Sequence, residues 1–139
     1  MAIRNVFEHV NALSESIENL DVEALKADLE SDQEVLLIDI REVQETVLLG
    51  GIPGAIHVPR GMLEFWADPA SPYARDYFGE DKRTVVFCAG GGRSVYAVKA
   101  LEEMGFSNVA HLAGGFTAWK EAGEEIEDIA AKSKWVKRD

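Results

Sequence analysis

Four stretches of the chain are short, apolar and rich in β-branched residues. Residues 35–40 are apolar almost throughout, residues 84–87 and 109–112 repeat this composition, and residues 55–58 lie between glycine and proline turn signals. Uninterrupted apolar runs of this length are typical of strands that are covered on both faces of a sheet. We therefore expect four strands, with the longer ones buried.

Between these runs, apolar residues recur every three or four positions, which is the spacing of an amphipathic helix. The first such segment, an amphipathic helix or helical lead-in, carries Phe7, Val10, Leu13, Ile17 and Leu20. Asp21 is well placed to cap a second helix that runs to about Glu30. Further helical segments are expected over residues 61–66, over residues 93–104 with Gly105 closing the helix, and over residues 115–122.

Strands and helices alternate along the chain. This order predicts an α/β domain with a mostly parallel central sheet flanked by helices. We expect a helical lead-in over residues 1–20, the α/β domain over residues 21–123 and a charged tail over residues 124–139. A length of 139 residues with 47% hydrophobic content fits one globular domain with its own core.

The formal net charge of −11 makes the chain strongly acidic. Such a chain is repelled by phosphate groups, and the basic cluster at residues 132–138 is short and terminal, so we expect no nucleic-acid partner. The apolar runs fall far short of the roughly 20 residues that cross a bilayer. The first residues also lack the basic flank and cleavage site of a signal peptide, so we expect a cytoplasmic location and no membrane partner.

Cys88 is the single cysteine of the sequence. One cysteine excludes an internal disulfide, a zinc site made from several cysteines of one chain, and a dithiol redox pair. His57 and His111 each lie in an apolar strand, where a hydrogen-bonded histidine is expected more often than a metal ligand. With His9 distant in the sequence, we expect no metal and no cofactor.

A glycine-rich loop follows the strand that ends at Cys88, with the sequence Ala89-Gly90-Gly91-Gly92-Arg93-Ser94. Glycines allow a loop to curl around one atom, and the following helix adds unpaired N–H groups and the positive end of its dipole. Together with Arg93, these groups favour a thiolate, which makes Cys88 the predicted nucleophile. Ser94 either donates a hydrogen bond to the sulfur or caps the helix. The alternative is that Cys88 is simply a small buried core residue.

Four ordered motifs carry a resemblance to a known family. They are Asp39-Ile40-Arg41-Glu42 after a strand, Ile52-Pro53-Gly54-Ala55-Ile56, the loop from Cys88 to Arg93, and Gly114-Gly115-Phe116-Thr117-Ala118-Trp119. From about Asp21 to Gly123 the chain resembles the rhodanese family of sulfurtransferases. The resemblance implies a rhodanese-like three-layer domain.

The resemblance also implies a reaction. Cys88 would take the outer sulfur of a donor such as thiosulfate as a persulfide and pass it to cyanide, a small thiol or a protein acceptor. The backbone amides of the loop would cradle the persulfide, with Arg93 as charge anchor; these residues are Ala89, Gly90, Gly91, Gly92, Arg93 and Ser94. Both a monomer and a homodimer fit the sequence.

Other polar residues near the motifs have two interpretations each. Asp39 and Arg41 resemble a catalytic pair, but a charged pair at a strand end is more often a structural clamp for neighbouring loops, which is the interpretation we favour. Arg60 and Trp66 follow a proline turn and either line the mouth of the site or are a surface arginine and a packed aromatic residue. Trp119 is expected to fill the core.

Two positions depart from the family pattern. Gly51 stands where relatives often have histidine, and Ala89 stands where many thiosulfate users have a cation. One arginine should hold doubly charged thiosulfate less well than two cations, so we expect thiosulfate to be an assay substrate rather than the physiological one.

Two alternatives to this reaction remain open. Cysteine phosphatases of related fold have five residues between cysteine and arginine, whereas four separate Cys88 from Arg93. Phosphatase or arsenate reductase chemistry is therefore a minor alternative. The other is a non-catalytic binding module, or a sulfur relay that works only when docked to a partner.

Overall fold

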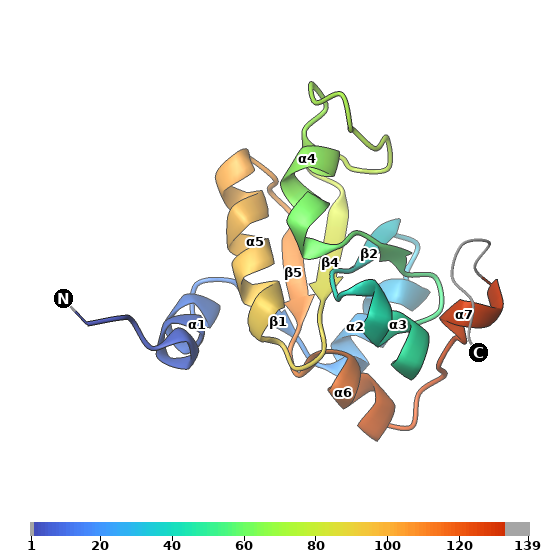
Figure 1. Ribbon diagram of the computed structural model, residues 1–139. Helices are drawn as coiled ribbons and strands as arrows, with labels where there is room; N and C mark the ends of the chain where they lie inside the picture. The colour runs from blue at the N-terminus through green and yellow to red at the C-terminus, as the bar shows by residue number, and fades with distance from the viewer. Residues whose placement is uncertain (1, 133–139) are drawn as a thin grey trace.

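The computed structural model describes residues 2–132 and is built around a five-stranded sheet (Figure 1). The strands are β1 (Glu18–Leu20), β2 (Val35–Asp39), β3 (Ile56–His57), β4 (Arg83–Phe87) and β5 (Val109–Leu112). Their order in the sheet is β1-β5-β4-β2-β3, and every neighbouring pair is parallel. The predicted α/β class with a parallel sheet is confirmed.

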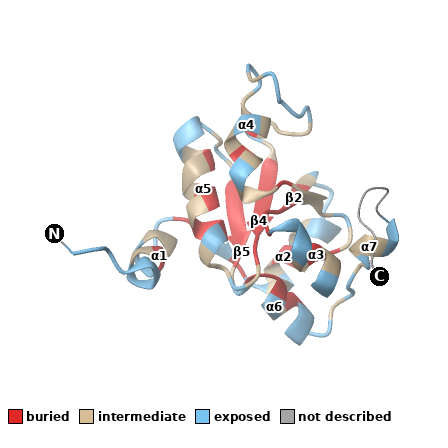
Figure 2. Ribbon diagram, viewed as in Figure 1, coloured by how far each residue is buried: buried red, intermediate tan, exposed pale blue. Residues whose placement is uncertain are grey.

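Helices cover both faces of the sheet. They are α1 (Val6–Ser14), α2 (Val22–Glu30), α3 (Val43–Leu49), the 3-10 turn η1 (Arg60–Met62), α4 (Leu63–Ala67), α5 (Gly92–Met104), α6 (Gly115–Glu121) and α7 (Ile129–Lys132). Side chains of α1, α4 and α5 form one core cluster with β2 and β4, whereas those of α2 and α6 form a second cluster on the opposite face. Figure 2 shows the central strands buried between these two layers. Within residues 2–132, no helix is long and apolar enough to span a membrane.

Alternation along the strands divides the core into these two clusters. In β2, Leu36 and Ile38 belong to the cluster of α5, and Leu37 belongs to the cluster of α2 and α6. Successive side chains of a strand point to opposite faces, so a strand that is apolar at each position supplies both layers. This is why the continuous apolar runs predicted buried strands.

The helix boundaries follow local signals. The Asp21 side chain accepts a hydrogen bond of 2.8 Å from the backbone N–H of Ala24 and so caps α2, as predicted. Gly105 closes α5 with a φ of 111°, in the left-handed region where glycine lacks the Cβ penalty of other residues. The predicted strands and helices between residues 21 and 122 are all present.

The N-terminal segment differs from the prediction of one helix reaching Leu20. Helix α1 ends at Ser14, and residues 18–20 form β1, the edge strand beside β5. Ile17 and Leu20 pack into opposite core clusters, which fits a strand and not one helical face. The carboxylate of Glu18 accepts two 2.7 Å hydrogen bonds from the buried guanidinium of Arg83 on β4, which ties this edge to the sheet. That hydrogen bonding lowers the pKa of Glu18.

The C-terminal segment, predicted as a charged tail, packs against the domain over its described residues. Gly51 and Glu127 form an antiparallel bridge, with N–H to carbonyl distances of 2.9 and 2.8 Å in the two directions. A Cβ at Gly51 would lie 3.0 Å from the Cδ1 of Ile129, so the small residue there leaves room for this segment. Residues 133–139, including most of the basic cluster, lie outside the described part of the chain.

Replacing Gly50 should release this C-terminal segment. At the φ of 84° of Gly50, an alanine Cβ would lie 2.6 Å from Ile126 Cγ2 and 2.8 Å from the carbonyl oxygen of Glu127. Gly54 has a φ of 85° but nothing within 4 Å of an added Cβ, so Gly54→Ala is the matched control. We expect Gly50→Ala to lower the free energy of unfolding by about 2 kcal/mol more than the control. Hydrogen exchange should show loss of protection at Gly51 and Glu127 only in Gly50→Ala; equal protection in both variants would contradict the packing described.

Candidate active site

Cys88 lies at the carboxyl end of β4, where the sheet meets the N-terminus of α5. The Sγ atom accepts a hydrogen bond of 3.2 Å from the backbone N–H of Gly91 and lies 3.6 Å from the hydroxyl oxygen of Ser94. Cys88 is only 1% exposed, which by itself would also fit an inert core thiol. The two hydrogen-bond partners are what make the sulfur different from a core residue, because they can stabilise negative charge on it.

The first turn of α6 holds the loop in this shape. The N–H of Phe116 donates to the carbonyl of Cys88 at 2.8 Å, and the N–H of Thr117 donates to the carbonyl of Ala89 at 3.0 Å. These are N–H groups that the start of a helix leaves without partners inside the helix. With the two carbonyls turned toward α6, the loop can turn the N–H of Gly91 toward the sulfur.

Close approach of α6 to the loop requires glycine at two positions. A Cβ at Gly115, whose φ is 58°, would lie 2.5 Å from the carbonyl oxygen of Cys88. A Cβ at Gly91, whose φ is 102°, would lie 3.0 Å from the backbone nitrogen of Gly114. By contrast, a Cβ at Gly90 or Gly92 would meet no atom within 4 Å, so the loop is open at these two positions.

Of the predicted cradle, the structure brings the N–H of Gly91 and the hydroxyl of Ser94 to the sulfur. The other backbone N–H groups of the loop are not hydrogen-bonded to Sγ within residues 2–132. Ser94 is completely buried, and its Oγ lies 3.6 Å from Sγ as the acceptor of the thiol proton, whereas the sequence predicted that Ser94 donates to the sulfur or caps the helix.

Arg93 lies in the first turn of α5 and pairs with a residue that the sequence did not single out. Its guanidinium donates to both carboxylate oxygens of Glu45 on α3, each at 2.8 Å. This pairing raises the pKa of Arg93, with a smaller contribution from the Cys88 thiol, so its positive charge also acts on the sulfur. The charge is thus present at the loop but shared with a carboxylate.

Glu45 is the partner that fixes Arg93. Its Oε2 atom also accepts a 2.9 Å hydrogen bond from the backbone N–H of Glu42, as part of a capping box at the start of α3. The hydrogen bond from Arg93 is the largest cause that lowers the pKa of Glu45 to about 2. The spacing of Glu42 and Glu45 was the available sequence signal for the cap, but nothing in it indicates the contact with Arg93.

Asp39 and Arg41 form a buried ion pair at the end of β2. The buried guanidinium of Arg41 donates to Asp39 Oδ2 at 2.7 Å and to the carbonyl of Gly50 at 2.7 Å. Its Cζ atom also lies 4.4 Å from the ring centroid of Phe116. Arg41 therefore links the end of β2, the loop after α3 and the first turn of α6. It supports the Cys88 loop through α6 and has no described contact with Sγ.

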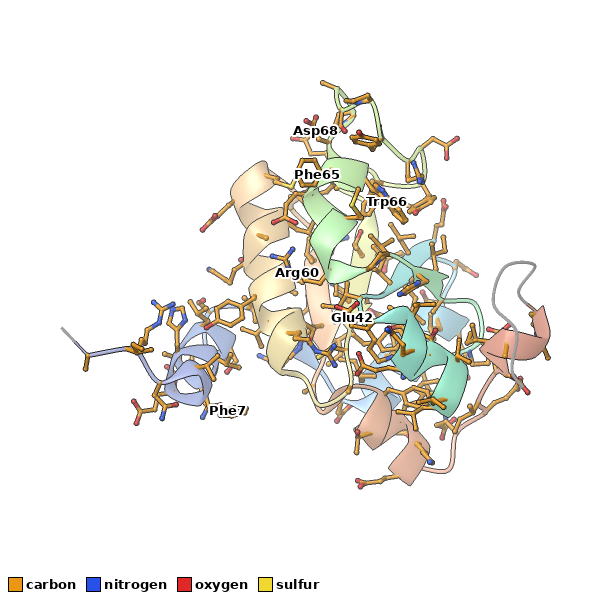
Figure 3. The ribbon with its side chains drawn as sticks, in the orientation of Figure 1. Phe7, Glu42, Arg60, Phe65, Trp66 and Asp68 are labelled. Carbon is orange, nitrogen blue, oxygen red and sulfur yellow. The ribbon has the colours of Figure 1, made fainter. Side chains whose placement is uncertain are left out.

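Arg60 and Trp66 make their described contacts away from the Cys88 loop. Arg60 Nη1 donates to Glu64 Oε1 at 2.7 Å, and the guanidinium carbon of Arg75 lies 4.1 Å from the ring centroid of Trp66. Figure 3 shows Arg60 directed toward α5 and Trp66 on the other side of α4. The structure does not bring either side chain into contact with the sulfur.

A separate cavity of about 700 Å³ lies at the opposite end of α5. Its lining includes Asp68, Arg75, Phe78, Met104 and Phe106. Because Met104 ends α5 and Cys88 lies before its first residue, this cavity is not part of the loop site.

The histidines of the sheet are hydrogen-bonded. His57 Nε2 lies 2.7 Å from the carbonyl oxygen of Arg41, and His111 Nδ1 lies 2.8 Å from the Ser94 hydroxyl. Across residues 2–132, no three His, Cys, Asp or Glu side chains gather as metal ligands. The sequence did not connect His111 with the loop.

The sequence profile of the rhodanese-like domain matches residues 21–122. The chain belongs to the rhodanese-like domain family. It is 36% identical over 104 residues to "Putative sulfurtransferase YtwF" of Bacillus subtilis (strain 168), which covers 75% of this chain and 91% of that protein. The family resemblance seen in the motifs is thus confirmed, and it places this rhodanese-like domain among sulfurtransferases.

Two solved structures resemble this rhodanese-like domain over most of their length. A protein of Rhodopseudomonas palustris CGA009, described as of unknown function and as a "Possible Tyrosine Phosphatase", is 44% identical with a TM-score of 0.84, covering 91% of this chain and 97% of that one. The polysulfide-sulfur transferase homodimer of Wolinella succinogenes is 27% identical with a TM-score of 0.71, covering 92% and 90% of the two chains.

Substituting Gly115 should disturb the loop directly. In Gly115→Ala, the added Cβ would overlap the carbonyl oxygens of Cys88 and Ala89, so α6 must move away and the loop loses its support. We expect a loss of about 2 kcal/mol in the free energy of unfolding and at least tenfold slower alkylation of Cys88 at neutral pH. Gly61→Ala is the control, since a Cβ there meets nothing within 4 Å. Unchanged thiol reactivity in Gly115→Ala would contradict the proposed support.

Removing the Glu45 carboxylate should destabilise the protein in a pH-dependent way. The pKa of Glu45 is depressed to about 2 in the folded protein, so its stabilising contribution is complete above the ordinary value of 4.5 and is lost as the pH falls toward 2. Glu45→Gln should therefore reduce stability at pH 7 by about 1 kcal/mol or less, and the gap to the wild type should close as the pH falls through this window. Urea unfolding at several pH values measures this gap. Glu64→Gln, which breaks the pair with Arg60, is the control; a gap for Glu45→Gln that persists below the window would refute the assignment.

Proposed function

We propose that this protein transfers a sulfane sulfur through a persulfide on Cys88. The observation that supports the proposal is the pair of polar groups beside one sulfur: the N–H of Gly91 donates to Sγ at 3.2 Å, and the hydroxyl oxygen of Ser94 lies 3.6 Å from it. Both can stabilise an anionic sulfur, and Arg93 adds a positive charge at the loop mouth. Membership of the rhodanese-like family is consistent with this chemistry.

The proposed cycle has two displacements. The Cys88 thiolate attacks the outer sulfur of a donor, a new S–S bond forms, and the donor's own bond to that sulfur breaks. The leaving group takes the electron pair; with thiosulfate, it is sulfite. An acceptor then attacks the terminal sulfur of the persulfide, the S–S bond breaks, and the electron pair returns to Cys88 as thiolate. With cyanide the product is thiocyanate, and with a thiol it is a new persulfide.

The local charge favours donors that carry one negative charge over doubly charged thiosulfate. Arg93 is paired with Glu45, and Arg60 is paired with Glu64, so both arginines are partly neutralised. Cys88 is also only 1% exposed, which favours a narrow donor with a terminal sulfur, such as a thiol persulfide or a hydrogen polysulfide. The similarity to the Wolinella succinogenes polysulfide-sulfur transferase supports this choice. Thiosulfate remains the proposed assay donor.

The proposed acceptors are cyanide, a small thiol or the thiol of a partner protein. One cysteine per chain means that no second thiol of the same chain can discharge the persulfide. The proposed setting is the cytoplasm, with no cofactor and no nucleic-acid or membrane partner, and either a monomer or a homodimer as the working form.

Phosphatase chemistry is a second candidate because of one comparison. The Rhodopseudomonas palustris structure that is described as a possible tyrosine phosphatase is 44% identical to this chain. A phosphatase needs a loop that surrounds a phosphoryl group and an acid for the leaving alkoxide. Asp39 is engaged by buried Arg41, and the loop has four residues between Cys88 and Arg93, so the geometry favours a single sulfur.

The first test is the intact mass of the protein after brief exposure to thiosulfate or to inorganic polysulfide. We expect one added sulfur on the wild type, with polysulfide loading faster than thiosulfate, and complete removal of the added mass by cyanide. Cys88→Ser should gain no sulfur while keeping its circular dichroism spectrum, because the two side chains are of similar size.

Other outcomes separate the alternatives. Absence of any added sulfur with both donors, together with hydrolysis of p-nitrophenyl phosphate that depends on Cys88, would replace the proposal by a phosphatase. Absence of both activities with a folded protein would support the binding module or the partner-dependent relay.

A further inference from the structure

A chain of hydrogen bonds leads from buried Cys88 across β5 to Asn19 on the edge strand β1. Cys88 Sγ lies 3.6 Å from Ser94 Oγ, Ser94 Oγ lies 2.8 Å from His111 Nδ1, and His111 Nε2 lies 2.6 Å from Asn19 Oδ1. Cys88, Ser94 and His111 are 1%, 0% and 3% exposed, so water does not compete for the contacts among them, whereas Asn19 is exposed. The chain joins β4, α5, β5 and β1.

Asn19 determines which nitrogen of His111 carries a proton. The Nδ2 group of Asn19 donates to the carbonyls of Ser14 at 2.8 Å and Ile17 at 3.0 Å, so its Oδ1 is the atom that faces the histidine. A carbonyl oxygen can only accept, and therefore Nε2 of His111 must be protonated. In a neutral imidazole, Nδ1 is then an acceptor.

This tautomer gives every hydrogen bond in the chain one direction. Nδ1 of His111 accepts the Ser94 hydroxyl proton, which leaves the oxygen of Ser94 to accept the S–H of Cys88. The thiol proton therefore points along a path that ends on a basic nitrogen. The same logic joins nucleophile, base and orienting group in other enzymes, although here a hydroxyl lies between the sulfur and the base.

We propose that His111 is a positioning residue for Cys88 that acts through Ser94 and takes up the proton when the thiol ionises. The S–H bond breaks as Ser94 Oγ receives that proton, and the original hydroxyl proton of Ser94 moves to Nδ1 of His111. The products are a thiolate, a Ser94 hydroxyl that donates to it, and an imidazolium that donates to Ser94 and Asn19. Every partner is hydrogen-bonded in both states. The role assumes the proposed function only in making Cys88 the nucleophile.

The surroundings couple the two charges. Burial lowers the pKa of His111, which keeps the imidazole neutral while Cys88 is a thiol. The charged or titratable groups on the neighbouring strands and on the helices that cover its face of the sheet are Glu18 on β1, Arg83 on β4, Glu8 and His9 on α1, and Arg93, Tyr96, Lys99, Glu102 and Glu103 on α5. Glu8 and Glu103 are exposed. Their described contacts go elsewhere: Glu18 binds Arg83, Arg93 binds Glu45, Lys99 contacts Glu102, and His9 contacts Tyr96. The charge that can hold a proton on His111 is thus the Cys88 thiolate itself.

The first measurement is the ultraviolet absorbance of the thiolate as a function of pH. Cys88 is the single cysteine, so Cys88→Ser supplies the baseline. His111→Gln can accept from Ser94 and donate to Asn19 but cannot take up a proton, and it should lower the thiolate absorbance at neutral pH about tenfold. Ser94→Ala should do the same. His57→Gln, in the same sheet but bonded to Arg41, should leave that absorbance unchanged.

The second measurement uses the unaltered protein and does not depend on a variant folding. The proposed transfer moves a proton within the protein, so at neutral pH nitrogen-15 NMR should show His111 protonated on both nitrogens in the same fraction of molecules that hold a Cys88 thiolate, and on Nε2 alone in the rest. In Cys88→Ser, His111 should be protonated on Nε2 alone at the same pH. Wild-type thiolate absorbance in His111→Gln, or a doubly protonated His111 in Cys88→Ser, would overturn the proposal.

These readouts are independent of sulfur transfer. Absence of the thiosulfate and polysulfide adducts on the wild type, together with a lower thiolate absorbance in His111→Gln, would refute the proposed function and support the role of His111. Normal adducts with unchanged thiolate absorbance in His111→Gln would refute the role of His111 and support the proposed function.

Discussion

The site depends on the contact between the first turn of α6 and the carbonyls of the Cys88 loop. Helix starts leave N–H groups without partners, and here the N–H groups of Phe116 and Thr117 are satisfied by Cys88 and Ala89. The contact is possible only because Gly115 has no side chain, since a Cβ would come within 2.5 Å of the Cys88 carbonyl oxygen. The glycine pair far from the cysteine in sequence is therefore part of the loop's construction. Arg41, stacked on Phe116 and tied to Asp39, holds this turn in place.

The electrostatics of the site are local and do not follow from the net charge of −11. An acidic protein repels anions at long range, but the sulfur experiences one amide, one hydroxyl and the shared charge of Arg93. Dipoles that are fixed by the fold do not have to reorganise when charge develops on the sulfur. Glu45 partly neutralises Arg93 and also holds its guanidinium in place. One ion pair therefore sets both the position of Arg93 and the net positive charge at the loop.

Features that depend on neighbouring residues were predicted well from the sequence. The limits of α5, its closing glycine, the Asp21 cap and the buried strands follow from spacing within about a dozen positions. The features that the sequence did not predict depend on residues that are far apart in the sequence. The strand at residues 18–20 exists because it pairs with β5, and the apolar positions before it fit a helix equally well. Glu45 meets Arg93 across 48 positions, and Asn19 meets His111 across 92, so neither pair has a local signal. Helix α3 was not predicted, because its seven residues are too few to show a clear helical spacing of apolar positions.

Both edges of the sheet are unusually short. At one edge β1 spans three residues, and at the other β3 spans two. An exposed strand edge offers unpaired N–H and carbonyl groups to another chain, and its length determines how much hydrogen bonding a stray partner can gain. These short edges offer few hydrogen bonds to another chain, so concentrated protein should resist fibril growth by strand addition. The sheet also needs no second subunit to cover its edges.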